Sequence, residues 1–131
     1  MPLVARNLDT GAVIAHHVAV AATRSARRTG LLRHTSLPEG QALWILPCRG
    51  VHTFRMRFAI DMIALDENGL VVDRVSHLQP WRVRLPRPRA SGVLELPAGW
   101  LDRTGTALGH RIEFSVHQSA APRSRALETA A

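Results

Sequence analysis

The chain has 131 residues, which suits one domain, and its net charge of +7 comes from arginine alone because the sequence contains no lysine. Cys48 is the only cysteine, so an intramolecular disulfide is excluded, and a chain of this length can fold without a metal. The positive charge favours anionic partners such as nucleic acid or phosphate groups.

The apolar run over residues 12–22 is too short to cross a bilayer, and it carries His16 and His17 in its middle. The first residues also lack the basic and apolar pattern of a secretory leader. The sequence therefore predicts a cytoplasmic protein with no membrane contact.

Two strands are predicted at the start of the chain, over residues 3–7 and 12–20. Their side chains are β-branched or small and apolar, which is typical of strands. Asp9 and Gly11 lie between them and favour a turn. The chain therefore begins with a β-turn-β unit.

A short helix is predicted near residues 23–32. Thr23 is a suitable N-cap, Gly30 lies near the expected end, and the residues between are helix formers with no β-branched run. After a loop, residues 42–46 read as a buried strand that Pro47 closes.

The clearest hairpin signal lies around Asn68 and Gly69, which separate two strand-like runs over residues 60–65 and 70–78. The following segment, residues 79–89, is rich in proline and arginine. It is predicted to be extended and exposed.

Two further strands are predicted near the end of the chain. One ends at Pro97, and the other begins after Gly109 and alternates Ile112, Phe114 and Val116 on one face. Strands joined by short turns predict a mostly β fold. We expect a single compact β-sandwich or barrel-like domain over residues 1–117, with one short helix near 23–32, one helical turn near 99–104 and a flexible tail over 118–131.

Three stretches carry a resemblance: GLLRHTSLPEG (30–40), HTFRMRFAIDMIALDENGLVV (52–72) and VLELPAG (93–99). In order and spacing the chain resembles the bacterial and archaeal family called domain of unknown function 192, from about Val18 to Val116. The resemblance implies a compact, mostly β single domain and supplies no accepted catalytic set. The recurrent positions that map here are Gly30, Leu31, Pro38, Gly40, Phe54, Met56, Ile60, Asp61, Asp66, Gly69, Glu95, Ala98 and Gly99.

A two-sided strand is predicted over the HTFRMRF run. Phe54, Met56 and Phe58 would face the core, and Arg55 and Arg57 would face solvent. Two guanidinium groups on one face can bind a carboxylate or phosphate. The first functional hypothesis is a non-enzymatic binding module for a small anionic ligand or peptide end, and its candidate residues are His52, Thr53, Arg55, Arg57, Asp61 and Glu95.

The two carboxylates of that set lie within apolar strands. Asp61 shares the face of Ile63 and Leu65, so it needs a partner, either Arg57 or a backbone amide. Glu95 faces opposite to its leucine neighbours and is expected to point to solvent. If the two strands approach each other, the carboxylates could form a general acid–base pair.

Two alternatives remain open. One is a small hydrolase-type enzyme that uses Asp61, His52 and perhaps Cys48, which requires these side chains within about 4 Å of one another. The other is single-stranded nucleic-acid binding through a stacking aromatic and nearby arginines. The simpler interpretation is that these residues belong to a solvated loop with no binding role. The residues of this second alternative are Trp81, Arg82, Arg84, Arg87 and Arg89. The histidine spacings match no metal motif, and neither a metal nor another cofactor is expected.

Overall fold

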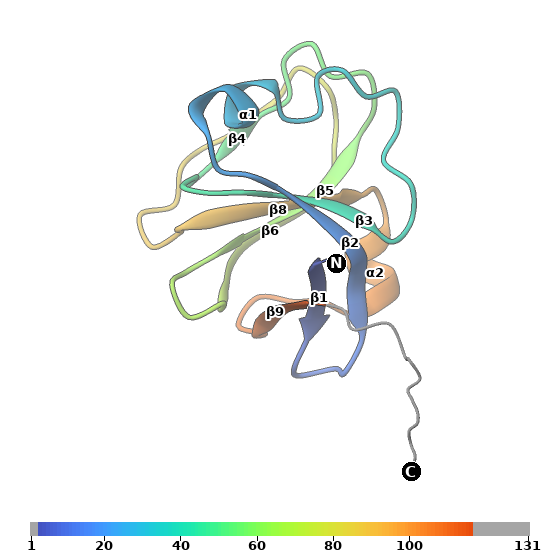
Figure 1. Ribbon diagram of the computed structural model, residues 1–131, viewed down its shortest axis with the longest axis vertical. Coiled ribbons are helices and arrows are strands. Elements are labelled where there is room, and N and C mark those ends of the chain that lie inside the picture. Colours follow the sequence, from blue (N-terminus) through green and yellow to red (C-terminus); the bar gives the residue numbers. More distant parts are fainter. Residues whose placement is uncertain (1–2, 117–131) are drawn as a thin grey trace.

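A curled sheet of seven strands forms most of the molecule, and the computed structural model describes residues 3–116 (Figure 1). The strands of this sheet are β1 (Leu3–Asn7), β2 (Val13–Ala21), β3 (Gln41–Ile45), β5 (Ile60–Leu65), β6 (Val71–Leu78), β8 (Gly92–Pro97) and β9 (Ile112–Val116). Their order is β6-β5-β8-β3-β2-β1-β9. Neighbouring strands run antiparallel except β2 and β3, which are parallel.

Two short helices and a two-stranded ribbon pack around the sheet. They are α1 (Arg24–Thr29), α2 (Trp100–Thr104), β4 (Val51–His52) and β7 (Val83–Arg84), and β4 pairs antiparallel with β7. In Figure 1, α1 and β4 lie together at the top, whereas α2 lies lower, beside β2. The predicted helix and helical turn are therefore confirmed. No helix within the described residues is long and apolar enough to span a bilayer.

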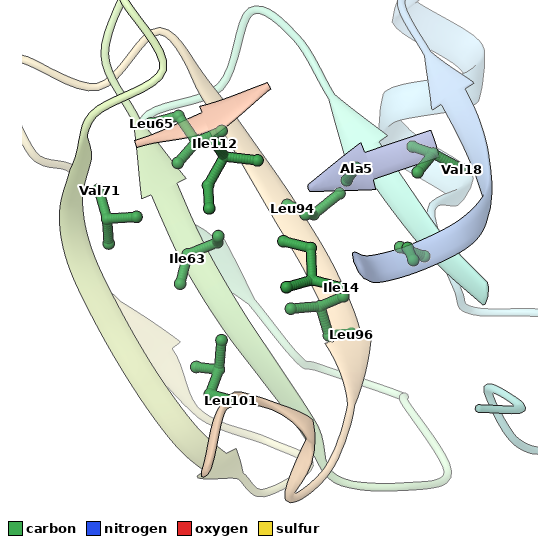
Figure 2. Close-up of a cluster of buried hydrophobic side chains, with 12 residues drawn as sticks. Ala5, Ile14, Val18, Ile63, Leu65, Val71, Leu94, Leu96, Leu101 and Ile112 are labelled. Carbon is green, nitrogen blue, oxygen red and sulfur yellow. The ribbon is translucent and has the colours of Figure 1, made fainter. Parts of the chain in front are cut away.

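The inner face of the curled sheet carries the larger apolar core. Its buried side chains come from all seven strands and from α2, and Figure 2 shows them pointing toward one another. Alternation along β8 places Leu94 and Leu96 on this face, because successive strand residues point to opposite sides. Each fully buried leucine or isoleucine contributes about 1.5–3 kcal/mol to folding. This core therefore holds α2 against the sheet.

The two edge strands of the sheet meet at one end. The Val71 amide donates to the His110 carbonyl at 2.9 Å, and the Ile112 amide donates to the Gly69 carbonyl at 2.8 Å. These bonds join the start of β6 to the start of β9 and partly close the curl. The predicted mostly β, barrel-like fold is confirmed as a half-barrel. The predicted tail over 118–131 lies outside the described residues.

The outer face of the central strands carries a second core. Met62 and Val93 point to this side, together with Ile45 of β3. Leu31, which follows α1, and Met56, which lies between β4 and β5, cover it. The central strands are thus buried on both faces, and every residue of β5 and β8 is buried.

The segment between β4 and β5 is a loop, so the predicted two-sided strand was wrong. The Met56 amide donates to the Thr53 carbonyl at 3.1 Å and closes a turn, and Arg55 adopts a left-handed conformation with φ of 66°. The turn breaks the alternation that a strand would impose. Phe54 is consequently 41% exposed while Met56 is buried. Both arginines of the segment are exposed, as expected.

Candidate functional site

A cavity of about 500 Å³ lies on the outer face of the sheet, and we call it the α1 cavity. It is bounded by the end of α1, the end of β3, β4 and the turn that follows β4. Its walls are mostly apolar and include Leu31, Ile45, Val51 and Met56. The polar groups in the lining are therefore few, and each one has chemical significance.

Glu95 belongs to the lining of the α1 cavity and comes from the middle of β8. In the paired strands it stands opposite Leu43 on one side and Met62 on the other, so it lies on the face of the second core. Its side of the strand is covered, and the residue is only 4% exposed. The expected solvent-facing position was wrong, because β8 is a central strand with both faces packed.

The carboxyl group of Glu95 has no hydrogen-bond or ion-pair partner among residues 3–116, whereas buried polar groups are normally paired. Burial disfavours its charged form and raises the pKa of Glu95 to about 7. Near neutral pH this group therefore exists in both protonation states. A buried, unpaired carboxyl that lines a cavity is a candidate for contact with a ligand.

Cys48 lies beside Glu95 in the same lining. Its thiol donates to the Gly50 carbonyl, with 3.0 Å between sulfur and oxygen. Burial raises the pKa of Cys48, and the nearby Glu95 carboxylate raises it further. These effects oppose formation of the thiolate that a nucleophile requires. Glycine is needed at position 50 because a Cβ there would lie 2.5 Å from the Arg84 carbonyl oxygen.

The rim of the α1 cavity is cationic. Arg27 and Arg28 come from α1, and His52 and Arg55 come from β4 and the turn that follows it. The Arg27 guanidinium donates to the Ala22 carbonyl at 2.8 Å. Within the described part of the chain, no carboxylate lies within ion-pair distance of any of these three arginines. Their charges are therefore open to an external anion.

Sequence reasoning singled out only Arg55 and His52 of this rim. Arg27 and Arg28 lie within the predicted short helix, and a solvated face is the usual interpretation of charged residues on such a helix. The position of α1 over the second core brings them to the cavity, and no local sequence signal indicates that packing.

Asp61 does not reach the α1 cavity. It pairs with Leu96 in the sheet, so its side chain lies on the inner face, as predicted. One carboxylate oxygen accepts from the amides of His77 at 2.8 Å and Gly99 at 3.0 Å, and the other accepts from Leu101 at 2.8 Å. The backbone-amide alternative is confirmed, and the Arg57 partner was wrong. Asp61 is fully buried and its oxygens are occupied.

Thr53 also has a structural role. Its hydroxyl donates to the Gln79 carbonyl at 2.6 Å and accepts from the Arg82 amide at 2.9 Å. These bonds fix the loop after β6 against the turn after β4. Arg57 is exposed and does not contribute to the cavity lining.

The structure does not assemble the acid–base groups of the enzyme alternative. Cys48 and His52 line the α1 cavity, but Asp61 is bound to backbone amides on the other side of the sheet. Asp61 and Glu95 likewise point to opposite faces, so they form no acid–base pair. Within residues 3–116, no three His, Cys, Asp or Glu side chains are grouped closely enough to hold a metal ion.

The predicted nucleic-acid segment is only partly free. Arg84 forms a two-bond contact with Asp73 at 2.6 and 2.9 Å, and Arg87 approaches the same carboxylate at 3.4 Å. Arg82 and Arg89 are exposed. Trp81 is 60% exposed, and its ring lies next to that of Phe54.

Three aromatic rings form a row beside the cavity mouth. The His52 ring stacks on Phe54 with centroids 4.8 Å apart, and Phe54 contacts Trp81 with centroids 5.9 Å apart. A single aromatic was expected from the sequence. The turn at Thr53 brings the three rings together by tying the loops that carry them.

A mostly β domain built on a curled seven-stranded sheet, with a cavity between its outer face and a short helix, is the class that these observations define. The chain belongs to the family domain of unknown function 192, described as an uncharacterised ACR family, whose model matches residues 5–114. A UPF0127 protein of Thermococcus sibiricus is 31% identical over 117 residues, covering 86% of this chain and 75% of that protein. The UPF0127 protein PH1112 of Pyrococcus horikoshii is 35% identical over 82 residues, which is 59% of this chain and 70% of that protein.

Two crystal structures share the fold. A protein of unknown function from Novosphingobium aromaticivorans has a TM-score of 0.73 and 21% identity, covering 86% of this chain and 84% of that one. A protein from Sinorhizobium meliloti, described as a candidate transcription regulator, has a TM-score of 0.72 and 20% identity, covering 86% and 91%. At these identities the likeness extends to the fold alone. The predicted family and fold class are confirmed.

Proposed function

We propose that the protein is a binding module that takes a small anionic ligand, or the carboxyl end of a peptide, at the α1 cavity. The observation that carries the proposal is the set of three arginines at the rim, none of which has a carboxylate partner among the described residues. The cytoplasmic location expected from the sequence remains a prediction.

The chemistry of the lining supports an anion with an apolar body. Guanidinium groups bind carboxylates and phosphates through paired hydrogen bonds. The apolar walls favour burial of a hydrocarbon chain, which contributes about 0.8 kcal/mol for each buried CH₂ group. A ligand that places its anion at the rim and its chain inside satisfies both regions. Arg55 and His52 are retained from the predicted set, whereas Thr53 and Asp61 are already engaged by the backbone.

Isothermal titration of the protein with hexanoate, hexyl phosphate and inorganic phosphate tests this function. We expect the two chain-bearing anions to bind and inorganic phosphate to bind much more weakly. The double substitution Arg28→Ala with Arg55→Ala should weaken hexanoate binding at least about tenfold, since two charge-assisted contacts are removed. Arg24→Ala is the matched control, because Arg24 is exposed on α1 but does not line the cavity. Equal losses in both variants, or no binding of any anion, would overturn the proposal.

A second candidate function, binding of single-stranded nucleic acid, is favoured by the row of three rings at His52, Phe54 and Trp81. Bases stack on exposed aromatic rings, and exposed arginines attract the phosphates. Titration with a thymidine oligonucleotide at low salt should quench tryptophan fluorescence, and Trp81→Ala should remove most of the response. Affinity should fall steeply as salt rises. Unchanged binding by the Trp81→Ala variant would remove this candidate.

A further inference from the structure

Glu95 and the rim arginines place opposite charge requirements in the lining of one cavity. The rim carries Arg27, Arg28 and Arg55, which call for an anion. The interior carries one carboxyl group that is 96% buried and that has no partner within the described residues. We propose that the ligand of the α1 cavity is bipolar, with an anionic group held at the rim and an amino group that donates to Glu95 inside. This inference rests on the proposed function and names the class of ligand.

The other polar groups in the interior do not offer Glu95 a partner. The Cys48 thiol already donates to the Gly50 carbonyl. The remaining titratable or charged groups in the lining are Arg27, Arg28, Arg55 and His52, and none of them forms an ion pair with Glu95. The rest of the lining is largely apolar, so the middle of the ligand should be apolar.

A ligand ammonium is the group that best compensates this carboxyl. An isolated carboxylate in an apolar environment is costly, whereas a carboxylate paired with a cation and hydrogen-bonded is tolerated. A neutral ligand end would leave Glu95 protonated, but an ammonium would bind the ionised form. Binding of such a ligand should therefore expel the proton that Glu95 holds in the free protein. The raised pKa of Glu95, about 7, makes this exchange measurable near neutral pH.

The test compares 6-aminohexanoate with hexanoate and with hexylamine by isothermal titration of the whole chain. We expect 6-aminohexanoate to bind at least about tenfold more tightly than hexanoate, which corresponds to one good charged contact. Hexylamine should bind weakly because the rim arginines repel it. A series from 4-aminobutanoate to 8-aminooctanoate should have one optimum length, because the ligand must reach a rim arginine and Glu95 at the same time.

The variant Glu95→Gln should remove the preference for 6-aminohexanoate over hexanoate, because the glutamine amide cannot form an ion pair with the ligand ammonium. Glu113→Gln is the matched control, because Glu113 is an exposed carboxyl on β9, away from the cavity lining. Retention of hexanoate binding also shows that the Glu95→Gln protein is folded. If hexanoate binds but 6-aminohexanoate is no better, or if the preference survives in Glu95→Gln, the bipolar ligand is overturned while the anion-binding function stands. If no anion binds, both fall.

Counting protons separates an amino group from a ligand carbonyl at Glu95. Titration in two buffers of different ionisation enthalpy at about pH 6 should show release of about 0.9 proton with 6-aminohexanoate, because Glu95 is then mostly protonated. The ratio of 6-aminohexanoate to hexanoate affinity should rise about tenfold between about pH 6 and pH 8. Proton uptake on binding would overturn the proposal. So would the absence of proton release together with an affinity ratio that does not change between these two pH values.

Discussion

Two buried carboxylates occupy adjacent positions in the paired strands β5 and β8, yet they have opposite environments. Asp61 stands opposite Leu96 and faces the inner core, and three backbone amides satisfy it. Glu95 stands opposite Met62 and faces the α1 cavity with no partner among the described residues. Burial alone therefore does not define the role of a carboxylate. Asp61 supports the fold, and Glu95 imposes a cost that a ligand can relieve.

The largest effect is expected from Asp61→Ala. Removal of the carboxylate leaves three buried amides without an acceptor, and each unsatisfied group costs about 1–3 kcal/mol. We expect a loss of at least about 3 kcal/mol in the free energy of unfolding, measured by urea denaturation. Asp61→Asn keeps one acceptor oxygen and should lose less, so it remains measurable if the alanine variant does not fold. A loss under about 1 kcal/mol in both would remove the contrast between the two carboxylates.

A gain in the free energy of unfolding, and not a loss, is expected from Glu95→Gln. Because the folded pKa of about 7 lies above the unfolded value, the native state binds more protons between these two values, and stability falls as pH rises from about 4.5 to 7. Above this window the glutamine variant should be more stable than the parent by about 3 kcal/mol. At about pH 4 the difference should vanish. Urea denaturation at both pH values measures it, and an equal effect at the two would contradict the assignment.

The smallest effect is expected from Asp73→Asn, because Asp73 is a carboxylate whose partners are cationic side chains near the surface. The hydrogen bonds from Arg84 lower the pKa of Asp73. Stability from this contact is therefore present above the unfolded pKa and is lost as pH falls through the lower folded value. Since Arg84 is one-third exposed, we expect a loss of only about 1 kcal/mol near pH 7, and this loss should shrink as the pH falls through the lowered pKa of Asp73. A larger loss at low pH would contradict this account.

The local pattern of the sequence was sufficient for most strands and for the start of α1. The Thr23 hydroxyl accepts from the Ala26 amide at 3.0 Å, as an N-cap should. Turn residues located the hairpin, where Asp66 accepts from the amides of Asn68 and Leu70. Both signals depend on neighbours in the chain, which a sequence displays directly.

The errors came from contacts between distant segments. Glu95 was placed in solvent on alternation alone, although Val93 and Leu94 are consecutive apolar residues that indicate a strand packed on both faces. The turn after β4 depends on hydrogen bonds from Thr53 to residues 26 and 29 positions later. The approach of α1 to the cavity is likewise set by tertiary packing.

The bonds that Asp61 makes tie the existence of one helix to the rest of the sheet. Helix α2 has five residues, and its N-cap, Gly99, supplies no side-chain hydrogen bond. The missing acceptor comes from a residue 40 positions earlier. Leu101 is also fully buried, so its amide should exchange with deuterium only when α2 separates from the sheet. A single amide thus reports how firmly the helix and the sheet are coupled.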